Sequence, residues 1–320
     1  MDIDLSALRM IEREKDVPFD VLVELIELAL LHAYQRTEGS YPDARAELDR
    51  KTGKVTIWAI EFDNDDNPVG EFDDTPSGFG RIAAQTARNV IHQKLRDIAD
   101  DSVLGGFKNR VGKLIAGTIQ QGRDPEMVQV DVGELEAVLP PHEQVPGETY
   151  QHGDRIRALV VDVHRGPKGP SVTISRTHPG LVRELFAHEA PEIADGTVEI
   201  VALAREAGHR TKMAVRATRP GINAKGACIG ELGSRVRAVM SELGAEKIDI
   251  VDHSEDPAVF IANALSPAKA LGVEILDPKE KMARARVPAD QLSLAIGKEG
   301  QNARLAAKLT GWRIDIHSAQ

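Results

Sequence analysis

The last 140 residues of the chain contain an internal repeat, which restricts the possible folds more than any other feature of the sequence. Residues 228–237 read CIGELGSRVR and residues 295–304 read AIGKEGQNAR, so that the paired glycines lie 67 positions apart. Each copy continues with a helical pattern, a glycine and the tripeptide Ile-Asp-Ile. Strand-like segments precede each copy, at 198–203 with 212–217 and at 273–276 with 282–287. The repeat therefore predicts a compact α/β unit that occurs twice.

Each copy holds a Gly-x-x-Gly motif between two predicted helices, at 230–233 and at 297–300. Glycines allow a ligand to approach the backbone closely, and the start of the following helix offers free N–H groups, which suits a sugar-phosphate backbone. A single motif is weak evidence, because glycine pairs often only end a helix, but two copies in the same context indicate an RNA clamp. The predicted RNA-binding residues are Gly230, Gly233, Ser234, Arg235 and Arg237 in the first copy, and Gly297, Lys298, Glu299, Gly300, Gln301, Asn302 and Arg304 in the second.

The two motifs differ in charge. The first presents Glu231 and Leu232 between its glycines, and the second presents Lys298 and Glu299. Because Glu231 repels phosphate, we expect the first loop to bind weakly or to depend on the basic residues that follow it. A basic stretch precedes the first motif and contains Arg205, Arg210, Lys212, Arg216, Arg219 and Lys225. This stretch predicts either a track for the RNA backbone or a solvated hairpin face.

Between residues 113 and 176 the hydrophobic pattern has a period of two. Five short strands are predicted there, at 114–119, 127–132, 135–139, 155–164 and 171–175. Five strands of this length favour a small closed barrel of the OB class. Tyr150 is the only aromatic residue in this region, so we expect the barrel to act through charge or spacing rather than by stacking on bases.

The first hundred residues predict a helix, a hairpin and a second helix. Apolar residues recur at helical spacing around 21–29 and over 79–99, and the segments 44–49 and 54–62 read as the two strands of the hairpin. An acidic loop is expected at 63–74, and the glycine pair Gly105-Gly106 is expected to end the second helix. Residues 1–100 carry 12 basic and 21 acidic residues, whereas residues 181–320 carry 19 of each. This asymmetry indicates different partners for the two ends of the chain.

Composition excludes several classes of protein. With 42% hydrophobic and 28% charged residues the chain can form folded cores, which are mostly aliphatic because aromatic residues make up 4%. The single cysteine, Cys228, excludes a disulfide framework and a cysteine-based zinc site. A charged start and the lack of an 18-residue apolar run predict a soluble, cytoplasmic protein with no membrane contact.

No catalytic, cofactor or metal motif is recognisable. The segment 106–113 resembles a phosphate-binding loop but has the wrong spacing, and Leu114 stands where a hydroxyl side chain is needed. The acidic loop that begins at Asp63 has Pro68 and Asp74 where a calcium loop needs glycine and glutamate. We therefore expect no catalytic residue, no metal and no cofactor, and a solvated acidic loop that faces a basic partner.

The segments 226–251, 256–268 and 295–311 resemble tandem KH RNA-binding modules. Their order after an acidic helical domain and an OB-type barrel is similar to that of the NusA family of transcription elongation, termination and antitermination factors. The resemblance implies an acidic RNA-polymerase-binding domain at 1–105, an S-one type OB barrel at 106–180 and KH domains at 181–253 and 254–320. It also implies RNA polymerase core and nascent single-stranded RNA as partners, other antitermination factors as further candidates, and a monomer.

An alternative is a non-catalytic RNA-binding subunit of an RNA-processing or RNA-degrading complex. Barrel and KH pairs also accompany exoribonucleases, whose catalytic centre would then lie in another chain. The first 105 residues favour the polymerase-docked factor, because an accessory RNA clamp does not need a separate acidic domain.

Overall fold

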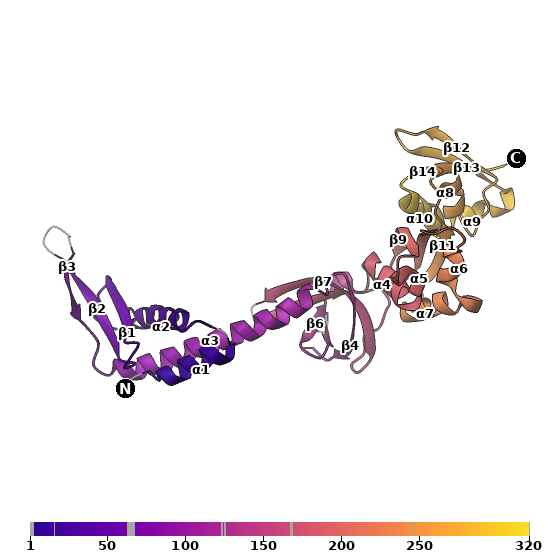
Figure 1. Cartoon of the computed structure of the whole chain (residues 1–320). Helices are drawn as coiled ribbons and strands as arrows, with labels where there is room; N and C mark the ends of the chain where they lie inside the picture. The colour runs from indigo at the N-terminus through magenta and orange to yellow at the C-terminus, as the bar shows by residue number, and fades with distance from the viewer. Residues whose placement is uncertain are drawn as a thin grey trace. The chain divides into compact units, whose positions relative to one another are not determined.

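The computed structural model describes residues 3–15, 17–62, 68–122, 124, 126–166, 169–244 and 246–319. The chain divides into two compact units, Met1–Val103 and Leu104–Gln320. Figure 1 shows that the N-terminal unit combines helices with a small sheet, and that the C-terminal unit contains the barrel and two α/β modules.

The N-terminal unit packs helices against a three-stranded antiparallel sheet. Its sheet has the strand order β1-β2-β3, and α2 lies beside β1 (Figure 1). Leu22, Ile26 and Leu30 of α2 are buried in the core against Leu48 and Ile57 of the sheet. The elements are α1 (Leu5–Lys15), α2 (Phe19–Tyr34), β1 (Ala44–Leu48), β2 (Val55–Phe62), β3 (Pro68–Asp73) and α3 (Phe79–Lys108), whose last residues belong to the second unit.

Three features of the N-terminal region differ from the prediction. Helix α1 was not anticipated from the sequence. The expected loop at 63–74 is wrong for residues 68–73, which form β3 and pair with β2, whereas residues 63–67 lie outside the described part of the chain. Helix α3 passes through Gly105-Gly106 instead of ending there. Leu104 and Phe107 are buried on either side of these glycines, and burying two large side chains offsets the cost of about 1 kcal/mol per glycine in a helix.

The barrel agrees with the expected OB class in having five strands that close on themselves. The strand order is β4-β5-β6-β8-β7, β7 also pairs with β4, and only the pairing of β6 with β8 is parallel. Inward residues alternate along the strands and are aliphatic, as Ile115, Val130 and Ile174 illustrate. The strands are β4 (Leu114–Gln120), β5 (Val128–Asp131), β6 (Glu136–Leu139), β7 (Arg155–Gly166) and β8 (Gly169–Ser175), with a 3-10 turn, η1 (Pro141–Glu143), before β7.

The sequence repeat corresponds to two modules of the same topology. In each sheet the middle strand is antiparallel to one neighbour and parallel to the other. The first module comprises α4 (Pro179–Glu189), α5 (Pro191–Ala194), β9 (Val198–Glu206), β10 (Arg210–Ala217), α6 (Ala224–Ile229), η2 (Glu231–Gly233), α7 (Ser234–Glu242) and β11 (Lys247–Asp252). The second comprises α8 (Pro257–Ala264), β12 (Gly272–Asp277), β13 (Met282–Val287), η3 (Ala289–Gln291), α9 (Leu292–Ile296), η4 (Lys298–Gly300), α10 (Gln301–Thr310) and β14 (Arg313–Ser318).

One apolar core joins the two modules. Ala204, Ala214 and Val251 of the first module are buried in the same cluster as Leu305 and Leu309 of the second. Helix α10 therefore packs on β9, a strand of the other module. This shared core fixes the distance between the two repeated loops.

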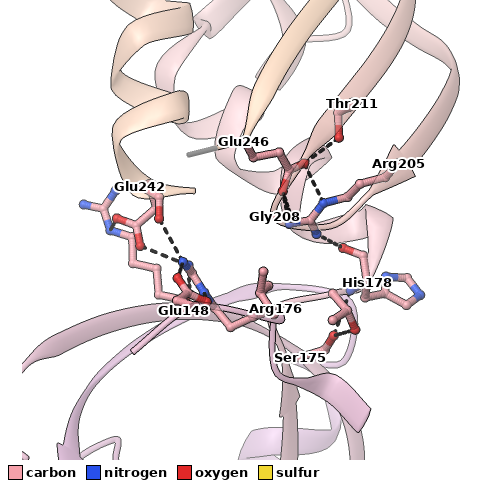
Figure 2. Close-up of polar contacts among 12 residues, drawn as sticks. Glu148, Ser175, Arg176, His178, Arg205, Gly208, Thr211, Glu242 and Glu246 are labelled. Atoms are coloured by element: carbon pink, nitrogen blue, oxygen red, sulfur yellow. Dashed lines mark hydrogen bonds and ion pairs between the residues drawn. The ribbon is translucent and has the colours of Figure 1, made fainter. Parts of the chain in front are cut away.

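A buried polar network joins the barrel to the first module (Figure 2). Arg176 follows the last barrel strand, and its side chain is 4% exposed. Its guanidinium pairs with Glu148 of the barrel region and with Glu242 at the end of α7, and it donates to the carbonyl oxygen of Arg157 at 2.8 Å. Burial opposes the charge of Arg176, but the two carboxylates outweigh it and raise the pKa of the guanidinium.

Candidate nucleic-acid interface

The two Gly-x-x-Gly loops have the same backbone conformation. Gly230 and Gly297, the first glycines, have φ/ψ of 73°/174° and 78°/171°. Gly233 and Gly300, the second glycines, are left-handed, at 76°/19° and 72°/13°. Two loops 67 residues apart thus present one shape, which sequence similarity alone does not guarantee.

The first glycine of each loop is required by its conformation. A positive φ combined with a ψ near 170° is accessible essentially only to glycine. At Gly297 a Cβ atom would also lie 2.8 Å from the backbone nitrogen of Asn302. The loop can therefore adopt this sharp turn only if its first residue is glycine.

A non-glycine residue in the left-handed region occupies the third position of each loop. Leu232 has a φ of 51° and Glu299 a φ of 54°. This conformation costs roughly 1–2 kcal/mol for an L-residue. Both side chains are exposed, Leu232 to 88%, so the strain turns them outward and leaves the loop backbone accessible.

A helix begins directly after each loop. Helix α7 begins at Ser234 and α10 at Gln301, and no described side chain caps either N-terminus. The first N–H groups of each helix are therefore available to a ligand, and the helix dipole favours a negative charge there. The loop and helix together make the kind of anion site that a phosphate group suits.

The structure separates the predicted residues of the first loop into two groups. Ser234 and Arg237 are exposed, and the guanidinium of Arg237 lies beside Gly233. Arg235 instead packs over Gly230, donates to the carbonyl oxygen of Ala227 at 2.6 Å and pairs with Glu192 at 2.7 Å. Arg235 therefore supports the loop from within the protein.

In the second loop, Lys298, Glu299 and Arg304 are exposed, whereas Asn302 is 1% exposed. The Asn302 amide donates to the carbonyl oxygens of Leu265 and Ala295, at 3.0 and 2.9 Å. Asn302 thus connects the start of α10 to the helices before it.

The second loop faces a hollow of about 780 Å³ that the first module helps to line. Gly297 and Lys298 line it from the loop, and Gly208, His209 and Lys247 line it from the turn between β9 and β10 and from the start of β11. These three residues of the first module were not predicted from the sequence. Nothing in their spacing indicates the contact, because only the packing of the two modules brings them to the loop.

Two residues of the basic stretch before the first motif have buried side chains, so neither an RNA track nor a solvated face describes them. The side chain of Arg205 is 2% exposed and pairs with Glu246, and that of Lys212 is fully buried and pairs with Asp249 at 3.0 Å. Burial lowers the pKa of Lys212, against the pull of Asp249. Arg210 and Arg216 also form ion pairs, but Arg216 is exposed and Arg210 lines the hollow beside the second loop. Arg219 is exposed as well, so for this part of the stretch the two predictions stay open.

Tyr150, the aromatic residue of the barrel region, also forms its hydrogen bonds within the protein. Tyr150 donates a hydrogen bond to Glu148 at 2.6 Å and accepts one from the backbone N–H of Val145 at 3.0 Å. Burial raises the pKa of its hydroxyl. Tyr150 thus supports the polar network around Arg176.

Within the described ranges, no helix is long and apolar enough to cross a membrane, and no three His, Cys, Asp or Glu side chains group as metal ligands. Residues 63–67 of the rejected calcium loop, which runs from Asp63 to Asp74, lie outside those ranges. Cys228 is buried in α6, and burial raises the pKa of its thiol to about 11. Its side chain packs in the core of the first module.

A closed five-stranded barrel followed by two modules whose Gly-x-x-Gly loops share one backbone conformation defines a multidomain RNA-binding protein of the KH class. Family models support this class: the NusA-like first KH domain matches residues 176–253, the NusA-like second KH domain matches residues 257–320, and the NusA N-terminal domain matches residues 5–62.

Relatives cover almost the whole chain. The transcription termination/antitermination protein NusA of Mycobacterium tuberculosis is 56% identical over 99% of this chain and 93% of the relative. NusA of Bacillus subtilis is 44% identical over 98% of this chain and 90% of the relative. A solution structure of the N-terminal domain of NusA from B. subtilis is 33% identical and covers 29% of this chain and 93% of that chain, with a TM-score of 0.25. The chain belongs to the NusA family, as the resemblance predicted.

Proposed function

We propose that the protein docks on RNA polymerase core through its N-terminal unit and binds nascent single-stranded RNA on its two KH loops. By holding RNA it modulates pausing, termination and antitermination. The proposed division of labour assigns residues 1–105 to polymerase, 106–180 to the S-one type barrel, and 181–253 and 254–320 to the two KH domains. The protein acts in the cytoplasm as a monomer, without catalysis and without a cofactor, and other antitermination factors are further partners.

The observation that carries this proposal is the matched pair of loops. Gly230 with Gly233 and Gly297 with Gly300 give the same backbone path at two sites, and each path leads into a helix N-terminus. The shared core of the modules holds the two sites in one rigid body. A single RNA strand that contacts both loops therefore gains affinity from the second contact without a new diffusional encounter.

In this proposal the twelve predicted RNA-binding residues divide between two roles. The glycines of both loops allow the sugar-phosphate backbone to approach, while Ser234, Arg237, Lys298, Gln301 and Arg304 contact phosphates directly. Arg235, Glu299 and Asn302 shape the loops that RNA contacts. Docking on polymerase raises the local concentration of nascent RNA, so modest affinity at each loop is sufficient.

The alternative is a non-catalytic subunit of an RNA-processing or RNA-degrading complex. The N-terminal unit favours the polymerase-docked factor, because it has a core of its own around Leu22 and Ile57 and carries most of the excess negative charge of the chain. A separate acidic unit of this kind suits a protein partner with a basic surface better than it suits RNA.

The test is the double substitution Gly297→Asp with Gly300→Asp in the full chain. Two carboxylates in the anion site repel phosphate, and we expect RNA affinity to fall at least about tenfold, as measured by fluorescence anisotropy with a labelled single-stranded RNA. Binding to core RNA polymerase, measured by co-purification, stays at the wild-type level. Unchanged RNA affinity contradicts the site, and no polymerase binding by the wild type favours the alternative.

Gly300→Asp alone is the structural control. A Cβ atom at Gly300 meets no other atom within 4 Å, and aspartate adopts the left-handed conformation more readily than most residues, so this substitution adds one charge at a small cost in strain. A partial loss of RNA affinity in this folded variant separates repulsion of phosphate from collapse of the loop.

A further inference from the structure

A carboxylate of the first KH module, that of Glu206, contacts the start of the helix that follows the second loop. Glu206 is the last residue of β9. Its Oε1 atom accepts a hydrogen bond from Nε of Arg304 at 2.6 Å, and its Oε2 atom accepts one from the side-chain amide of Gln301 at 2.9 Å. Both donors belong to the first turn of α10, directly after Gly300.

The donors that Glu206 uses are those that a phosphate would use. Carboxylate and phosphate oxygens accept hydrogen bonds of the same length and geometry from a guanidinium. The N-terminus of a helix favours either anion in the same way. Glu206 is therefore a chemical substitute for phosphate at this place.

Glu206 is charged at neutral pH. The hydrogen bond from Arg304 lowers the pKa of its carboxyl group, and Gln301 and the nearby Lys308 add to the effect. Its side chain is 19% exposed, so water and a competing anion can reach it. The pair is therefore an accessible ion pair and not a buried structural one.

Glu206 and the second loop line the same hollow. Lys298 of the loop and Lys247 of the first module also line it, and neither lysine has an ion pair among the described residues. An RNA strand entering this hollow would meet two free cations on its walls. Arg304 also lines the hollow, but its guanidinium is already paired with Glu206.

We propose that Glu206 occupies the phosphate position of the second loop in the RNA-free protein, and that a phosphodiester group of single-stranded RNA displaces it from Arg304 and Gln301. This inference rests on the proposed function and goes beyond it. A residue of the first KH module then limits the RNA affinity of the second module. When phosphate replaces the carboxylate at Arg304, the binding free energy gained is only the difference between the two interactions.

The test is Glu206→Gln in the full chain, with a labelled random-sequence RNA of about ten nucleotides, long enough for two KH loops. Glutamine keeps the size of the side chain but competes weakly for the guanidinium. An accessible ion pair is worth little, and we expect RNA to bind about two- to fivefold more tightly. If Glu206 instead orients Arg304 for RNA, the variant binds more weakly, and weaker or unchanged binding overturns the proposal.

Two controls separate displacement from a general effect of charge. Glu199→Gln removes an acid from the same strand, where Glu199 pairs with Arg216 at 2.9 Å, and it should leave RNA affinity nearly unchanged. In an Arg304→Gln background the gain from Glu206→Gln should disappear. An equal gain from Glu199→Gln, or a gain that persists without Arg304, overturns the proposal.

Failure of the proposed function gives a different result. If the wild type binds no RNA, or if Gly297→Asp with Gly300→Asp leaves binding unchanged, the second loop is not an RNA site and both proposals fall. If the double aspartate variant loses RNA but Glu206→Gln has no effect, only the displacement by phosphate is wrong.

Discussion

Glu246 illustrates how single charged residues stabilise the first KH module. Its side chain is 1% exposed and accepts hydrogen bonds from Arg205, from the hydroxyl of Thr211 and from the backbone N–H of Gly208 (Figure 2). Burial alone would raise the pKa of Glu246, but these donors outweigh it and lower the pKa. The residue is therefore ionised at neutral pH, and Arg205 depends on it for charge compensation.

We expect Glu246→Gln to destabilise the module by about 3 kcal/mol, because it leaves the buried guanidinium of Arg205 without a counter-charge. The free energy of unfolding can be measured in urea from the fluorescence of Trp312, with Trp58→Phe as the background. Glu199→Gln is the matched control, since its pair with Arg216 is exposed and should cost less than about 1 kcal/mol. Equal losses in the two variants would show that burial of the pair is not what matters.

At the scale of elements, the second loop depends on its two glycines to different extents. A Cβ atom at Gly297 would contact the backbone of Asn302, whereas one at Gly300 would meet open space. Gly300 has a left-handed conformation that other residues adopt at a cost, but the φ/ψ of Gly297 is closed to them.

Alanine substitutions should therefore lower stability by different amounts at the two glycines. We expect Gly300→Ala to cost about 1 kcal/mol and Gly297→Ala about 2–3 kcal/mol, from backbone strain and the contact with Asn302. Thermal unfolding monitored by circular dichroism gives the comparison, and RNA anisotropy gives the effect on binding. The reverse order of stability would mean that the loop rearranges around the first glycine.

The same elements show what could be predicted from the sequence. The helices and strands of the repeat and the five barrel strands follow from local periodicity, and the loops follow from glycine spacing, so these predictions are confirmed. Local signals were insufficient where tertiary packing decides, as in α3. There the burial of Leu104 and Phe107 outweighs two glycines.

Charge pairing was the least predictable part of the candidate site. Arg205 and Glu246 are 41 residues apart, and Glu206 and Arg304 are 98 residues apart. A sequence shows that such residues are charged, but only the packing of strands and modules shows which of them meet. Arg205 and Lys212 of the basic stretch were therefore misassigned, and Gly208, His209 and Lys247 at the hollow were missed.

At the scale of the whole molecule, Arg176 joins the barrel and the KH pair within the C-terminal unit. It lies between Glu148 and Glu242 and also donates to the carbonyl oxygen of Glu242 at 2.9 Å. Removing this one side chain would leave Glu148 with the hydrogen bond from Tyr150 and Glu242 with Arg157 at 3.9 Å, and both carboxylates would lose their closest counter-charge. Arg176 thus adds a charged contact to the apolar core that Leu159 of β7 shares with the first module.

We expect Arg176→Met to lower the free energy of unfolding by about 3 kcal/mol. Methionine fills much of the space of the arginine side chain but removes the closest counter-charge of the carboxylates of Glu148 and Glu242. Calorimetry should then resolve separate transitions for the barrel and the KH pair. Adding Glu148→Gln and Glu242→Gln should recover most of the lost stability, because replacing a whole charge network often changes the free energy of unfolding very little. If the triple variant is as unstable as the single one, the hydrogen bonds of Arg176 to the backbone of Arg157 and Glu242, and not its charge, hold the joint together.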